Sequence, residues 1–236
     1  MARRRPCIPR SAKSQGEFAN DRSGFHKDSN DGDAMMILRF SPSSPFVRKV
    51  RIAVALLGFE GEVTLERADT TDPNDSLRRT NPLGKIPVLI VEDGSAIYDS
   101  RVILDYLDER AGGGKIVPRA SKPRLDALRL QALSDGILDA SVLTVYETRY
   151  RKPDMHEPKW LDLQAGKVSR ALAALEAAPP SLDPMPNVGQ IALACALGYR
   201  DFRFGAGWRS EHPRLVAWLD DFAARVPAYA ATKPAG

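Results

Sequence analysis

The chain has 236 residues, 43% of them hydrophobic, which suits one or two small globular domains with a sizeable core. Its formal net charge of +4 is too small to indicate nucleic-acid binding, and no apolar run approaches the roughly 18 residues of a membrane span. Cys7 and Cys195 form no metal-ligand or redox motif and favour a cytoplasmic protein, and the scattered histidines indicate no metal site.

Residues 1–34 are rich in Arg, Ser, Asp, Asn and Gly and show no apolar periodicity. Such a segment cannot bury enough surface to offset the entropy lost on ordering, so we expect a disordered extension or an upstream start. A targeting segment or a nucleic-acid arm is the alternative, although the acidic residues of this stretch argue against a transit peptide.

The region 35–111 alternates between strand-like and helix-like patterns. Apolar alternation predicts four strands, at 36–40, 62–68, 88–92 and 95–98, the last two joined by an Asp93-Gly94 turn. Helices are expected at 45–57, for one turn in the 70s, and at 100–110. The order β-α-β-α-β-β-α predicts a compact α/β domain, and the glycines of 111–115 predict a flexible linker after it.

Residues 120–230 have helical patterns throughout and predict an all-helical second domain. Ser121 is the expected cap of its first helix, with Pro123 in the first turn. Further helices are expected at 158–178, at 187–199 and from about 213. Asn187 and Gln190 are spaced as a capping box, which is a folding signature and says little about ligands.

Two stretches of the α/β domain are typical of a pocket that grips a small peptide. Pro87 stands at the first residue of an apolar run, where a missing N–H harms a sheet least. Asp99 and Ser100 open a helix whose first N–H groups lack partners and attract an anion. Ser44, before Pro45, falls at the N-cap of the first helix, where its hydroxyl, the nearby N–H groups and the helix dipole act together.

This set of residues resembles the glutathione-binding half of the glutathione S-transferase family. In that family the residue before a cis-proline, here Ile86 before Pro87, pairs with the backbone of glutathione's cysteine. The pair Asp99-Ser100 matches the acidic residue and serine that hold the γ-glutamyl end. Lys85 matches a lysine near glutathione's carboxylate, although a solvated loop lysine is an equal alternative.

The segment from Ser41 to Ala53 resembles the Ser-Pro-Phe…Arg-Val-Arg-Ile-Ala pattern of serine-type classes such as tau, with Lys49 in place of the first Arg. The resemblance implies that Ser44 activates the glutathione thiol, with Ser43 and Ser41 as the fallback donors. The alternative is that Ser44 is only a helix cap.

The resemblance implies a thioredoxin-like domain followed by an all-α domain, and an enzyme that conjugates glutathione, its co-substrate, to a hydrophobic electrophile. Tyr146, Tyr150, Trp160 and Trp208 are candidates for the acceptor pocket or for the core. A homodimer is implied as well, with Arg101 facing the partner, the ligand or only solvent. Two alternatives stay open: a glutathione-dependent isomerase, dehalogenase or ether-cleaving enzyme, and a non-catalytic binding or regulatory protein.

Overall fold

The computed structural model describes residues 35–234, so the expected N-terminal extension lies outside the described residues. A four-stranded sheet has the order β2-β1-β3-β4, formed by β1 (Met36–Phe40), β2 (Val63–Arg67), β3 (Val88–Ile90) and β4 (Ala96–Ile97). The strand β1 pairs in parallel with β2 and antiparallel with β3, and β3 pairs antiparallel with β4.

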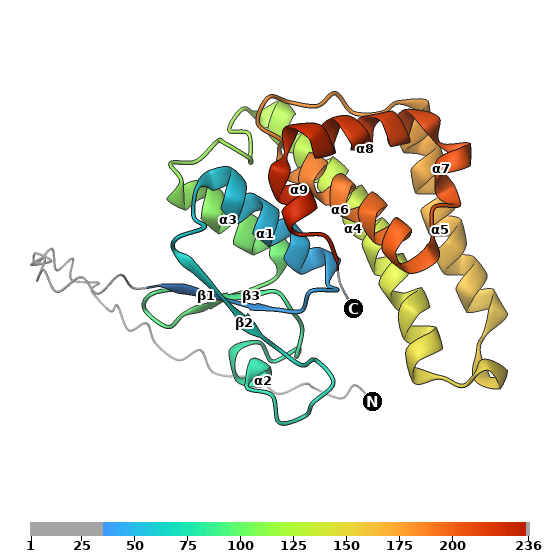
Figure 1. Ribbon diagram of the computed structural model, residues 1–236, viewed down its shortest axis with the longest axis horizontal. Helices are drawn as coiled ribbons and strands as arrows, with labels where there is room; N and C mark the ends of the chain where they lie inside the picture. The colour runs from blue at the N-terminus through green and yellow to red at the C-terminus, as the bar shows by residue number, and fades with distance from the viewer. Residues whose placement is uncertain (1–34, 235–236) are drawn as a thin grey trace, which may run out of the picture. The chain divides into compact units, whose positions relative to one another are not determined.

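Helices cover both faces of this sheet (Figure 1). The helices α1 (Pro45–Leu57) and α3 (Ser100–Arg110) lie on one face, and the single turn α2 (Leu77–Thr80) lies on the other. The helix α1 ends at Gly58, whose φ of 81° belongs to the left-handed region that glycine adopts readily. The predicted β-α-β-α-β-β-α order is confirmed.

Two local predictions in this half are wrong. The hairpin strands are shorter than expected, because β3 ends at Ile90 and a wider turn joins it to β4, closed by the Val91 N–H donating to the Ser95 carbonyl. The glycine-rich stretch 111–115 is held in place, since the buried Asp108 carboxylate accepts hydrogen bonds from the N–H groups of residues 114, 115 and 116.

From residue 121 to residue 231 the regular structure is helical, as predicted, and the fold class is confirmed. The elements are α4 (Ser121–Tyr150), the 3₁₀ turn η1 (Pro153–Met155), α5 (Pro158–Ala177), α6 (Val188–Phe204), α7 (Trp208–Glu211), α8 (Pro213–Arg225) and α9 (Pro227–Ala231). The short α7 and α9 were not expected, since so few residues show no period. Ser121 is not a cap, because Ala120 holds that position without a side-chain bond. Within 35–234, none of the helices combines the length and apolarity needed to cross a bilayer.

The helix α6 forms the centre of the helical part and packs along α4. Its N-terminus carries the predicted capping box, in which Asn187 and Gln190 each bond the other's backbone N–H. Residues Val188–Tyr199 are buried, and a Cβ at Gly189 would lie 2.5 Å from the Ala127 carbonyl oxygen of α4. Only glycine permits this close approach of the two helices.

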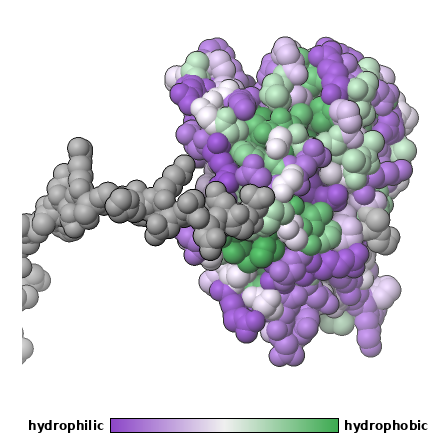
Figure 2. Space-filling model, turned by 60° about the vertical axis from the view of Figure 1, so that its left-hand side comes forward, coloured by the Kyte–Doolittle hydropathy of each residue, from purple (hydrophilic) through white to green (hydrophobic). Residues whose placement is uncertain are grey.

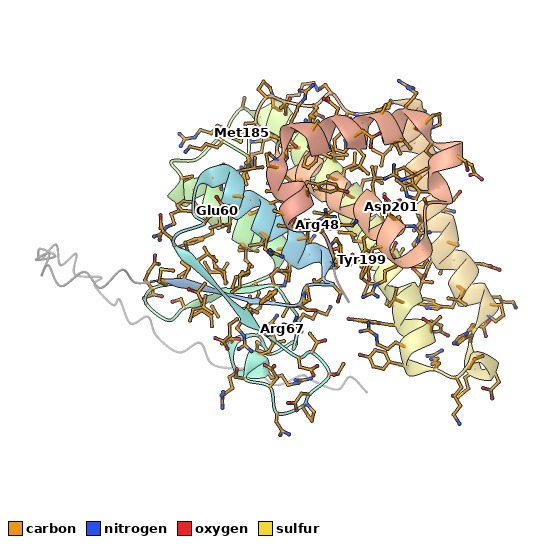
Figure 3. The ribbon with its side chains drawn as sticks, viewed as in Figure 1. Arg48, Glu60, Arg67, Met185, Tyr199 and Asp201 are labelled. Atoms are coloured by element: carbon orange, nitrogen blue, oxygen red, sulfur yellow. The ribbon has the colours of Figure 1, made fainter. Side chains whose placement is uncertain are left out.

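The helix α1 also contacts the helical part, so the two halves share one hydrophobic core. The buried Arg48 guanidinium donates to the Tyr229 carbonyl at 2.6 Å and stacks on the Tyr229 ring, 3.9 Å from its centroid. Figure 3 labels Arg48 on α1, and a Cβ at Gly198 of α6 would lie 2.5 Å from the Arg48 Nη1, so α1 and α6 are close here. Figure 2 shows one face of the protein, where most of the surface is polar and apolar patches are exposed between the polar residues.

Candidate functional site

Ser44 is the N-cap of α1, as predicted. Its backbone is extended (φ −80°, ψ 120°), Pro45 follows at the first helical position, and its Oγ accepts the Val47 N–H at 3.3 Å. This contact uses a lone pair of Oγ and leaves the hydroxyl proton without an acceptor among residues 35–234. The first turn of α1 carries no acidic residue, so no side-chain charge there opposes the positive end of the helix dipole.

The two neighbouring serines are arranged differently. The Oγ atoms of Ser41 and Ser43 lie 3.3 Å apart and share a hydrogen bond, in which either atom is the donor. One of those two hydroxyl protons is therefore already used within the loop. Ser44, by contrast, accepts a backbone N–H and, within residues 35–234, shares no hydrogen bond with another serine.

The loop before β3 places Lys85, Ile86 and Pro87 at the start of that strand. The Ile86–Pro87 peptide is cis, which confirms that prediction. The buried Asn81, which sequence reasoning missed, holds the loop: its Nδ2 donates to the Lys85 carbonyl at 2.9 Å, and its Oδ1 accepts the Leu83 N–H at 3.0 Å. The Asn-Pro sequence before a glycine is the turn signal that would have identified it.

Asp99 and Ser100 open α3 as predicted. Asp99 is the N-cap and its Oδ1 accepts the Arg101 N–H at 3.0 Å, whereas Ser100 is buried as the first helical residue. The Tyr98–Asp99 peptide is also cis. Arg101 lies against its own chain, with Nη2 3.0 Å from the Asp99 Oδ2. Partial burial raises the pKa of Asp99, but the hydrogen bonds and charge of Arg101 outweigh it, so that pKa is lowered overall.

A chain of charges joins the start of α3 to α1 through α4. The Arg101 Nε lies 3.9 Å from one oxygen of Asp135, and the other oxygen accepts from the Lys49 Nζ at 2.5 Å. Lys49 is fully buried and stands one turn after Ser44 on α1. Sequence reasoning noted Lys49 only as a departure from a pattern and missed Asp135, since 86 residues separate the pair.

The structure therefore connects part of the predicted site through ion pairs. Asp99, Arg101 and the first half of α1 are connected through Asp135, while the exposed Lys85 side chain makes no hydrogen bond within the described residues. No three His, Cys, Asp or Glu side chains of residues 35–234 lie together as metal ligands would.

The aromatic candidates divide between core and surface. Trp208 is 8% exposed and its Nε1 donates to Asp201 at 2.8 Å, so it belongs to the core. Tyr146 and Tyr150 form an edge-to-face pair with centroids 5.4 Å apart, and both are exposed, as is Trp160. The buried Tyr199 on α6, whose pKa is raised by burial, was not singled out from the sequence.

Cys195 is fully buried among the apolar residues of α6. Burial raises its pKa to about 11, so the thiol stays protonated at neutral pH.

Comparison with known proteins gives the same family for both halves of the chain. The family model of the glutathione S-transferase N-terminal domain matches residues 43–110, and that of the C-terminal domain matches residues 158–221. The "Uncharacterized GST-like protein YibF" of Escherichia coli (strain K12) is 34% identical over 199 residues, covering 82% of this chain and 96% of its own.

Two solved structures of a glutathione transferase family member from Pseudomonas fluorescens Pf-5 are 42% identical and cover 85% of this chain and 100% of theirs. One holds bound glutathione and superimposes with a TM-score of 0.77. The other holds bound S-(propanoic acid)-glutathione and has a TM-score of 0.74.

Proposed function

This chain belongs to the glutathione S-transferase family, and from that premise we propose that it is a glutathione transferase of the serine type. In this proposal the Ser44 hydroxyl donates to the glutathione sulfur and stabilises the thiolate. The observation that carries the proposal is the position of Ser44 at the N-cap of α1, with its hydroxyl proton not taken by any described residue.

The thiolate needs this help because a free cysteine thiol titrates near ~8.5 and is mostly protonated at neutral pH. Lowering the pKa of the thiol by ~2 units requires roughly 2.7 kcal/mol. A charge-assisted hydrogen bond contributes ~1.5–3 kcal/mol, and the N-terminus of α1 adds ~0.3–1 kcal/mol. The two terms together are sufficient, so no histidine or carboxylate base is required.

The remaining proposed contacts hold glutathione itself. The backbone of Ile86 before the cis Pro87 pairs with the cysteine of glutathione, Asp99 and Ser100 hold the γ-glutamyl end, and Lys85 meets the carboxylate region. The glutathione bound in the Pseudomonas relative supports glutathione as the ligand.

For the reaction we favour conjugation of the thiolate to a hydrophobic electrophile. The relative with bound S-(propanoic acid)-glutathione supports it, since that ligand carries a substituent on sulfur, as a conjugation product does. An isomerase would regenerate glutathione. A reductive dehalogenase would consume a second glutathione and release glutathione disulfide, whereas an ether-cleaving enzyme would expel an alcohol or phenol and leave a glutathione thioether. Mass spectrometry of both the glutathione product and the released acceptor fragment separates these reactions.

We also propose a homodimer in which α3 of one subunit faces α4 of the other. Apolar side chains before α3, on α3 and on α4 are open to solvent: Tyr98 (38% exposed), Val102 (52%), Leu125 (66%) and Leu128 (36%). Burying such side chains favours association. Sedimentation that gives only a species near 26 kDa at micromolar concentration would reject the dimer.

The decisive test is Ser44→Ala with a generic aryl halide as acceptor. The variant keeps the contacts to glutathione, so binding should fall only modestly. Loss of ~2–3 kcal/mol of thiolate stabilisation lowers turnover at neutral pH roughly 30- to 150-fold, and raising the pH should partly restore it. Ser43→Ala is the matched control and should keep most of the activity.

If Ser44→Ala has the rate and pH profile of the unchanged protein, Ser44 is only a helix cap. If instead neither protein turns over any electrophile but both bind glutathione, the non-catalytic alternative holds. Either outcome is read directly from the pair of assays.

A further inference from the structure

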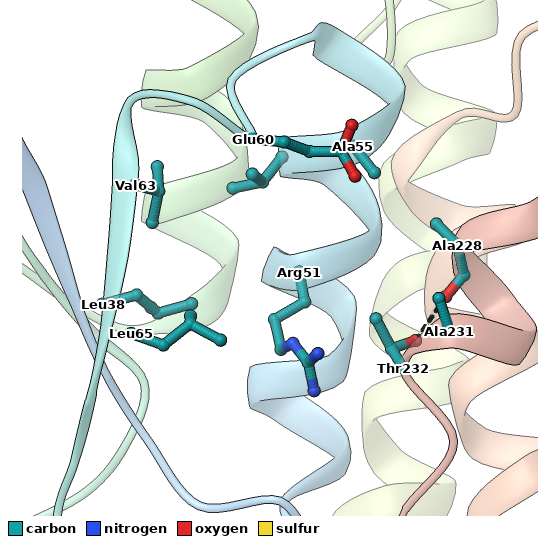
Figure 4. A pocket seen from close by; sticks show the side chains of 10 residues that line it. Leu38, Arg51, Ala55, Glu60, Val63, Leu65, Ala228, Ala231 and Thr232 are labelled. Atoms are coloured by element: carbon teal, nitrogen blue, oxygen red, sulfur yellow. Dashed lines mark hydrogen bonds between the residues drawn. The ribbon is translucent and has the colours of Figure 1, made fainter.

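A crevice of about 210 Å³ lies between the sheet edge and the C-terminal helix, away from the proposed glutathione contacts (Figure 4). Its apolar wall comes from β1, β2 and α1, and consists of Leu38, Val54, Val63 and Leu65. The opposite wall is the α9 segment, with small side chains and the Thr232 hydroxyl. Since β2 is an edge strand, its side of this wall reaches solvent: Leu65 is 42% exposed, whereas Leu38 and Val54 are buried.

The half-buried Arg51 lies between these two walls (Figure 4). Within residues 35–234 its guanidinium makes no hydrogen bond or ion pair. Burial, and then the charge of Arg48, lower the pKa of Arg51, which means that both effects disfavour its cation. An arginine keeps its charge nevertheless, so its N–H groups are donors without a protein acceptor in the described part of the chain.

The surroundings of Arg51 add positive potential and little negative charge. Arg48, one turn away on α1, donates to two neutral oxygens, the Tyr229 carbonyl and the Thr232 Oγ1. Among residues 35–234, Glu60 is the one acid that lines the crevice, and it lies at the other end, near Ala55 (Figure 4). A bound anion is therefore attracted to the Arg51 end and repelled from the Glu60 end, which fixes its orientation.

The volume limits the size of the ligand. A cavity of about 150 Å³ holds one benzene molecule, whereas drug-sized ligands occupy about 300–1,000 Å³. A crevice of about 210 Å³ therefore suits a short hydrocarbon body. We propose that it binds a medium-chain carboxylate, with the head group paired to Arg51 and the chain lying on the apolar wall.

The test uses octanoate as the probe and isothermal titration calorimetry of the full chain with saturating glutathione present. The unchanged protein should bind octanoate and should bind octan-1-ol at least about tenfold more weakly, because the alcohol lacks the charge that pairs with Arg51. Arg51→Gln should weaken octanoate binding by a similar factor. The matched control, Arg170→Gln on the exposed face of α5, should leave it unchanged.

A second variant tests the location without altering charge. Ala55→Leu places a larger side chain in the crevice and should abolish octanoate binding while leaving the affinity for glutathione unchanged. The proposal is overturned if octanoate does not bind, if it competes with glutathione, or if Arg51→Gln and Arg170→Gln have the same effect. Because the Arg51 side chain makes no hydrogen bond or ion pair within residues 35–234, Arg51→Gln remains informative even if Ala55→Leu does not fold.

Discussion

The ion pair between Lys49 and Asp135 fastens α1, which carries Ser44, to α4. The Lys49 side chain is 0% exposed, that of Asp135 is 8% exposed, and 2.5 Å separates Nζ from Oδ1. Replacing Lys49 by Met keeps the length and most of the volume of the side chain but removes its charge. Asp135 then remains buried, with Arg101 at 3.9 Å as its remaining cation among the described residues.

We expect Lys49→Met to lower the free energy of unfolding strongly, because the buried Asp135 carboxylate loses its nearest cation. Breaking a buried pair by removing one partner costs about 3–5 kcal/mol. In a domain of this size each 1 kcal/mol changes the melting temperature by about 2–4 °C, so the variant should melt roughly 6–20 °C lower. Urea unfolding measures the free energy directly, and an unchanged slope would show that the unfolded state is not affected.

The double variant Lys49→Met with Asp135→Leu separates charge burial from packing. It should recover most of the lost stability, since a buried pair replaced by apolar residues is often neutral. The surface pair Arg225–Asp221, with side chains 48% and 45% exposed, is the matched control, and Arg225→Met should cost no more than about 0.5 kcal/mol. The reasoning fails if Lys49→Met loses less than about 1 kcal/mol, or if the double variant is no more stable than the single one.

Two further predictions concern α6. Gly189→Ala should lower the free energy of unfolding by about 1–3 kcal/mol, because the new Cβ would lie 2.5 Å from the Ala127 carbonyl oxygen. The control Gly136→Ala in α4, with open space around it, should raise that free energy by up to about 1 kcal/mol. Equal effects of the two variants in urea unfolding would contradict the close approach of α6 to α4. In a Cys7→Ser background, Cys195 should not react with a disulfide reagent at pH 8 until urea unfolds the chain. The reason is that a buried thiol with a pKa of about 11 is mostly protonated at that pH. Fast labelling of the folded protein would refute the burial of Cys195.

The starts of α1, α3 and α6 and the end of α1 could be predicted from the sequence because they depend on contacts within three or four residues, whereas the cap of α4 and the end of α6 at Phe204 were not. Ser44 and Gly58 bound α1, Asp99 caps α3, and Asn187 with Gln190 caps α6, each as expected. The order of strands and helices followed from apolar periodicity in the same way. These signals are local, so a chain carries them whatever its final packing.

The tertiary structure decided what depends on distant partners. The pairing of Lys49 with Asp135 joins residues 86 apart, and no spacing along the chain indicates it. The glycines of the stretch 111–115 predicted a flexible linker. Its last N–H groups instead donate to the Asp108 carboxylate, whose burial only the packed structure reveals. The sequence favoured Ser44 among the three serines before α1, and the fold adds the partner of each hydroxyl: Ser41 and Ser43 share a hydrogen bond, whereas Ser44 accepts the Val47 N–H. Burial and partnership are properties of the packed chain, and the chemistry proposed for this protein depends on both.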